Sequence, residues 1–136
     1  MLFFTQYKKS IDNITIILHD KSLPVIQQYI QGKWKLQYQT GGFCSTCTVY
    51  PTDTTFNLFM TLTDERIDLK NNYYHTVDTT ITWSYIQVFR DSAYALNFTY
   101  SSGIPFTLVP DRIHNDKLVI YQPGPDGLTF YYSESN

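Results

Sequence analysis

Alternation of apolar and polar residues with a period of two dominates the chain after residue 33. The stretch WKLQYQ at 34–39 places its apolar residues on one side of a strand and its lysine and glutamines on the other. The same alternation recurs at 55–62 and 93–100. Segments of this kind have one buried face and one face in water, which is typical of antiparallel strands.

Turns rich in glycine, asparagine, aspartate and proline separate these segments. Asn71-Asn72 marks one turn, and Asp126-Gly127 is a hairpin signal. No helical pattern lies between the strands, so we predict an antiparallel meander. The eight predicted strands lie near residues 34–39, 55–62, 66–70, 80–89, 93–100, 105–109, 117–122 and 128–132.

One short helix is predicted ahead of the strands. The stretch SLPVIQQYI at 22–30 begins with a serine suited to an N-cap and a proline suited to the first turn, and its isoleucines and tyrosine share one face. The helix ends near Gly32. Before it, residues 1–21 form an N-terminal extension in which ITIIL at 14–18 fits either a short strand or an apolar segment packed across the domain. We therefore divide the chain into this extension and a β-domain at 22–136.

An eight-stranded meander with one apolar face either closes into a barrel or splits into a sandwich. Closure removes exposed strand edges and therefore favours the barrel. The predicted fold is all-β, an eight-stranded up-and-down antiparallel barrel preceded by a short N-terminal helix.

Composition supports strands and excludes some partners. The 136 residues suit a single domain, and a 17% aromatic content beside only 16% charged residues favours strands. A net charge of -2 provides no basic field for phosphates, so we expect no nucleic-acid partner. No apolar stretch approaches the roughly 20 residues that cross a bilayer. The start of the chain also lacks the order of a secretory signal.

The stretches YIQGKWKLQYQTGG and DKLVIYQPGPDGLTFYY resemble the lipocalin-like, calycin-type domains of small envelope proteins from Bacteroides-type bacteria. The likeness covers roughly residues 24–133. It implies that Gly32 lets the helix close tightly over the end of the barrel, and that Trp34 plugs this end. It also implies a small apolar or amphipathic ligand in the open end, and a location in the cell envelope or periplasm.

The sharpest local motif is CSTC, with Cys44 and Cys47. In redox enzymes such a pair lies at a helix N-terminus, whose dipole lowers the pKa of the first thiol. Here the motif precedes TVYPTDTTF, which describes a loop that enters a strand. We predict either a local disulfide or a pair of thiols that clips the first interstrand loop, with a thiol-dependent enzyme as the competing hypothesis.

The spacing of the histidines, cysteines and acidic residues indicates neither a metal site nor an acid–base catalytic site. His19, His75 and His114 have no short paired spacing with one another or with the cysteines, so we predict no metal site and no cofactor. The acidic residues around Arg66 fit a solvated turn, and no carboxylate falls on an apolar strand face. We predict that the protein is not an enzyme.

The inward strand faces supply the ligand hypothesis. Tyrosine and tryptophan suit a pocket, because each combines an apolar body with one polar group. An eight-stranded barrel either holds one small ligand or is filled by side chains. We predict a small-molecule carrier, with a solidly packed domain that docks a protein or glycan partner through its loops or outer face as the alternative. The predicted ligand-binding residues are Tyr38, Met60, Trp83, Tyr85, Phe98 and Tyr100.

Overall fold

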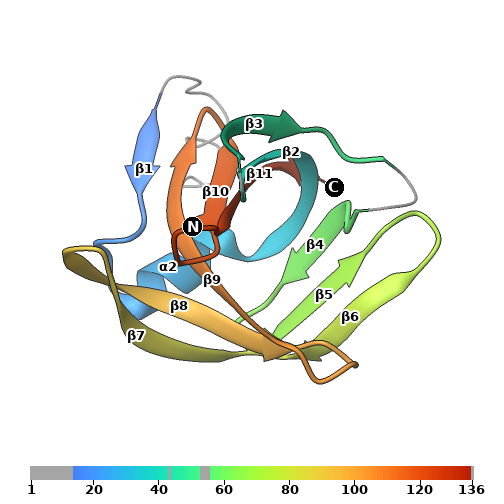
Figure 1. The fold of residues 1–136 in the computed structure, drawn as a ribbon. Helices are drawn as coiled ribbons and strands as arrows, with labels where there is room; N and C mark the ends of the chain where they lie inside the picture. Colours follow the sequence, from blue (N-terminus) through green and yellow to red (C-terminus); the bar gives the residue numbers. More distant parts are fainter. Residues whose placement is uncertain (1–13, 43, 53–55, 136) are drawn as a thin grey trace.

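The computed structural model describes residues 14–42, 44–52 and 56–135, and this part of the chain is mostly antiparallel β-structure with one short helix. The all-β prediction is therefore confirmed. In Figure 1 the strands form a sheet that curls strongly around itself. The elements are β1 (Thr15–Ile17), α2 (Leu23–Ile30), β2 (Gly32–Gly41), β3 (Cys44–Val49), β4 (Phe59–Leu62), β5 (Arg66–Lys70), β6 (His75–Thr80), β7 (Thr82–Val88), β8 (Asp91–Thr99), β9 (Pro105–His114), β10 (Lys117–Tyr121) and β11 (Leu128–Ser135).

The strands follow the order β6-β5-β4-β2-β11-β10-β9-β8-β7, and each neighbouring pair is antiparallel. Two short strands lie off this path, since β1 pairs with β9 and β3 pairs with β2. The first strand after the helix, β2, thus lies beside the last strand, β11. This pairing brings the two ends of the β-domain together in the middle of the sheet.

The two ends of the strand order, β6 and β7, are consecutive in the chain and separated only by Ile81. The strand predicted at 80–89 is β7, which pairs with β8, whereas β6 pairs with β5 and was not predicted. Among the described residues no ladder joins β6 to β7, and the sheet is a curled half-barrel. A closed barrel of eight strands stays a prediction.

Other strand boundaries also differ from the sequence prediction. The strand predicted at 55–62 is β4, which begins at Phe59, and residue 55 itself lies outside the described residues. The strand predicted to end at 109 continues as β9 to His114. In the N-terminal extension, β1 takes the strand alternative, and Leu18 beyond it is fully buried in the main core. Residues 1–13 of this extension lie outside the described part.

Helix α2 and Trp34 both pack into the main apolar core. Ile26 and Ile30 are buried on one face of α2, as the spacing of apolar residues predicts. Trp34 follows on β2 with 1% of its surface exposed, and its indole Nε1 donates to the Ile30 carbonyl at 2.8 Å. This hydrogen bond satisfies one of the carbonyls that a helix C-terminus leaves unpaired.

Gly32 joins α2 to β2, and its backbone conformation explains why a glycine stands at this position. A Cβ atom at this position would meet no heavy atom within 4 Å, so close packing does not explain the glycine. Its φ of +127° lies in a region that residues with side chains rarely adopt. The glycine is needed because the chain turns sharply from the helix into the strand.

Tyr132 on β11 is buried, and we therefore expect the free energy of unfolding to fall as the pH rises into the alkaline range. Burial, followed by the nearby Tyr100 hydroxyl, raises its pKa above the ordinary value of about 10. A raised pKa in the folded state contributes stability that is complete below pH 10 and is lost as the pH rises further. We expect Tyr132→Phe to reduce this loss by up to about 1.4 kcal/mol per pH unit. Urea unfolding at several alkaline pH values measures it, and equal slopes for both proteins would contradict the assignment.

Candidate functional site

Four of the six predicted ligand-binding residues lie in or against the main core. Met60 and Phe98 are buried, and Trp83 and Tyr100 pack against the same cluster. The rings of Phe98 and Tyr100 lie 5.7 Å apart, and each also contacts the ring of Phe106. These side chains fill space by contacting one another, which is what core packing requires.

Tyr38 lies on the outer face of the sheet, contrary to the prediction. Buried Tyr132 points into the core, so its neighbour Tyr131 points outward. Tyr38 is paired with Tyr131, and the two rings stack at 4.4 Å. Cross-strand partners share a face, so Tyr38 also points outward.

A β-bulge causes this reversal. The register between β2 and β11 shifts so that Tyr131 pairs with Tyr38 while Tyr132 pairs with Leu36, which leaves Gln37 without a partner in the ladder. One extra residue turns every later side chain of a strand to the opposite face. The alternation in the sequence carries no sign of this bulge.

Tyr85 is 63% exposed and does not line an interior. It pairs with Tyr94 in the β7–β8 hairpin, whereas β8 pairs with β9 only from Leu96 onward. Before Leu96, β8 therefore separates from β9, which pairs with β1 further along, and Tyr85 on the edge strand β7 remains in solvent.

Cys44 and Cys47 form a disulfide, with their Cα atoms 5.3 Å apart. Both lie on β3, where the register with β2 shifts between Thr40 and Gly41. The motif thus lies on a strand and not at the start of α2, so the helix dipole that activates a thiol is missing from this position.

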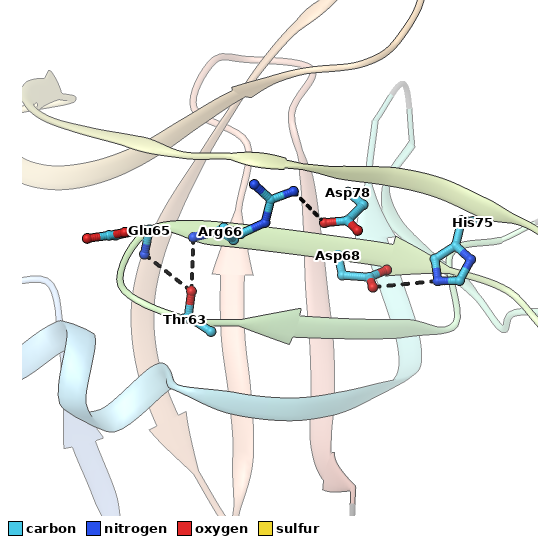
Figure 2. Close-up of polar contacts among 6 residues, drawn as sticks. All are labelled: Thr63, Glu65, Arg66, Asp68, His75 and Asp78. Carbon is cyan, nitrogen blue, oxygen red and sulfur yellow. Dashed lines mark hydrogen bonds and ion pairs between the residues drawn. The ribbon is translucent and has the colours of Figure 1, made fainter.

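The outer face of β5 and β6 carries a network of charged residues (Figure 2). Arg66 donates to Asp78 at 2.8 Å, and His75 lies 3.6 Å from Asp68. The Thr63 hydroxyl accepts hydrogen bonds from the amides of Glu65 and Arg66. Glu65 belongs to the turn between β4 and β5, as expected from the sequence, and Arg66 begins β5.

A cleft of about 290 Å³ lies beside this network, and we call it the tyrosine cleft. It lies where the outer faces of β2 and β4 meet the turn between β5 and β6. Aromatic rings, amides and cationic side chains form its walls. Its lining consists of Lys33, Phe59, Lys70, Asn71, Asn72, Tyr73, Tyr74 and His75.

The turn at 71–74 has a hydrogen-bonded backbone that carries two exposed tyrosines. The Asn71 side-chain oxygen accepts hydrogen bonds from the amides of Tyr73 and Tyr74, each at 2.7 Å. The Asn71 amide donates to the Tyr74 carbonyl at 3.0 Å and closes the turn. Tyr73 and Tyr74 are 65% and 68% exposed, and their rings lie 6.4 Å apart at a tilt of 53°. Because the rings do not stack on each other, their faces stay available.

Two further clefts lie elsewhere on the surface. One of about 420 Å³ borders the turn between β7 and β8 and includes His19, Arg90 and Asp111. The other, of about 340 Å³, follows β6 and reaches Thr99 and Ser101. Neither of them, nor the tyrosine cleft, is lined by any of the six residues that the sequence suggested as a ligand site.

The side chains that line the tyrosine cleft are of kinds that can bind a ligand. Its aromatic faces offer apolar contact, while its amides, ammonium groups and imidazole offer hydrogen bonds. Within the described ranges, no three histidine, cysteine or acidic side chains come together as a metal site would require. No helix in the described part is long and apolar enough to span a membrane.

Comparisons with protein-family models, with curated proteins and with solved structures return no match to this chain. The sequence prediction placed a turn at Asn71-Asn72 but did not identify a site there. The stretch NNYYH at 71–75 contains a usable signal, because two adjacent aromatic residues directly after a turn have little core to enter.

Proposed function

We propose that this protein is a non-enzymatic binding domain that holds a saccharide in the tyrosine cleft. One observation carries this proposal. The ordered turn at 71–74 places two largely exposed tyrosines at the edge of a concave surface with polar walls. Exposed aromatic residues on an ordered backbone provide a surface for contact with a ligand.

The chemistry of the lining favours a saccharide over a lipid. A sugar ring presents a face of C–H bonds that can stack on an aromatic ring, and hydroxyl groups at its edge that need donors and acceptors. Tyr73 and Tyr74 offer the rings, and Asn72 and His75 offer polar groups beside them. An acyl chain would leave these polar groups without partners, which carries a desolvation cost.

A small-molecule carrier with its ligand inside the sheet is the competing proposal from the sequence. The packing of Phe98, Tyr100 and Phe106 against one another argues for a filled interior at that position. We further propose that β6 and β7 act as one bent strand that completes an eight-stranded barrel, since only Ile81 separates them. A packed barrel of this kind would favour the alternative of a solid domain that docks a protein or glycan partner through its loops or outer face.

Alanine replacements in the tyrosine cleft test the proposal. We expect the double variant Tyr73→Ala, Tyr74→Ala to bind its saccharide at least about tenfold more weakly, because both stacking surfaces are removed. A printed glycan array identifies the ligand, and isothermal titration calorimetry measures the affinity. The stability of the fold is expected to stay nearly unchanged, because both side chains are exposed.

Tyr85→Ala is the matched control, since this tyrosine is equally exposed on a different part of the sheet. It is expected to bind like the wild-type protein. Unchanged saccharide binding by the Tyr73, Tyr74 double variant, or no saccharide binding by the wild-type protein, would contradict the proposed function.

A further inference from the structure

We propose that the tyrosine cleft selects saccharides that carry a carboxylate or sulfate group, and that Lys33 and Lys70 bind this group. The inference rests on the proposed function, because it assigns a charge to the saccharide. It depends on different residues, however, and can therefore fail separately.

The charges that line the cleft are of one sign. Lys33 and Lys70 contribute two ammonium groups, His75 contributes an imidazole, and none of the described lining residues is an acid. A neutral sugar would leave both ammonium groups with only hydroxyl partners. A carboxylate or sulfate group offers each of them a charge-assisted hydrogen bond, which is about twice as strong as a neutral one.

Each carboxylate of the network on this face lies beside a basic side chain, although Asp68 Oδ1 is buried without a hydrogen-bond partner among the described residues. Figure 2 shows Asp78 bound to Arg66 and Asp68 beside His75. Across the part of the chain that the structure describes, neither Lys33 nor Lys70 forms an ion pair. The two ammonium groups of the cleft therefore have no carboxylate partner within the described residues.

The two lysines lie around one aromatic ring. The Lys33 Nζ lies 5.2 Å from the centroid of the Phe59 ring, in a cation–π contact. In the next strand pair, Lys70 is the cross-strand partner of Phe59. Both lysines are half-buried, whereas Lys35 on the same face of β2 is exposed. Partial burial reduces screening by water, so an anionic group between these lysines is held more strongly than at an open surface.

The protein as a whole does not attract anions. Its net charge is -2, so selection of an acidic saccharide must come from the cleft itself. This separates the inference from general electrostatic attraction, because removal of a lysine outside the cleft should leave the selection intact.

A glycan array that carries each acidic saccharide beside its neutral counterpart tests the inference. Uronic acids are paired with their methyl esters, and sulfated glycans with the desulfated forms. We expect wild-type protein to bind at least one acidic member about tenfold more tightly than its neutral partner. The double variant Lys33→Gln, Lys70→Gln is expected to bind both members equally. Lys35→Gln and the charge-retaining Lys33→Arg are expected to keep the preference.

The outcomes separate the two proposals. Equal binding of acidic and neutral partners by wild-type protein, or a preference that survives the double lysine replacement, would overturn the inference while the proposed function stands. Loss of all saccharide binding in the Tyr73, Tyr74 double variant supports the proposed function under either result. A circular dichroism melt of each variant verifies that the fold is retained, and an unfolded double lysine variant would be replaced by the two single variants.

Discussion

Replacement of Trp34 by alanine is expected to lower the free energy of unfolding by about 3–5 kcal/mol. The indole is almost fully buried between α2 and the sheet, so its removal leaves a large cavity beside Ile26 and Ile30. The Ile30 carbonyl also loses the hydrogen bond that the indole donates. Because the total stability of a domain is about 5–15 kcal/mol, the variant should be close to unfolding at 37 °C. Urea denaturation followed by far-UV circular dichroism measures the loss.

Trp83→Ala is the matched control, because Trp83 is the other tryptophan and packs against the same core while half-buried. We expect it to cost about 1–2 kcal/mol, in proportion to the smaller apolar area that it covers. A Trp34→Ala protein as stable as Trp83→Ala would contradict the larger contribution of the buried Trp34 to the core.

Gly127→Ala is expected to destabilise the protein by at least about 3 kcal/mol. A Cβ atom on Gly127 would lie 2.0 Å from the Gln122 carbonyl oxygen, which belongs to the backbone and cannot move without disturbing the loop between β10 and β11. This loop holds β11 in place through a hydrogen bond from the Gln122 amide to the Leu128 carbonyl at 2.8 Å. Thermal unfolding and hydrogen exchange in β10 and β11 measure the effect.

Gly103→Ala serves for comparison, because it tests backbone conformation without a steric clash. Gly103 has a φ of +91°, and nothing lies within 4 Å of a Cβ at this position. The cost should be about 1–2 kcal/mol, from the strained φ alone. If Gly127→Ala lowered the free energy of unfolding by no more than Gly103→Ala, this result would contradict the close approach of Gly127 to the Gln122 carbonyl.

Much of the fold follows from the sequence, because alternation and turn residues are local signals. The segment 66–70 is β5 as predicted, and the helix ends two residues before Gly32. The strand predicted at 80–89 is β7, whereas β6 at 75–80 was not predicted. β6 pairs with β5 and β7 pairs with β8, and this change of partner at Ile81 depends on strands that are distant in the sequence.

The site could not be predicted from these signals. Which face Tyr38 occupies depends on a bulge opposite Tyr131 and Tyr132, and pairing across strands that are distant in the sequence leaves no mark in β2 itself. The tyrosine cleft likewise joins Lys33 to residues 70–75, which only the pairing of β2, β4 and β5 brings together. Lys33 by itself is one charge on the polar face of a strand.

The most direct test of the binding site is a ¹H–¹⁵N chemical-shift map of the wild-type protein, titrated with the saccharide that binds best on the array. We expect the largest shifts at the backbone amides of Lys33, Phe59 and residues 70–75, with little change at Trp83, Phe98 and Tyr100. Shifts concentrated at those three core residues would place the ligand inside the sheet and would contradict the tyrosine cleft as the site.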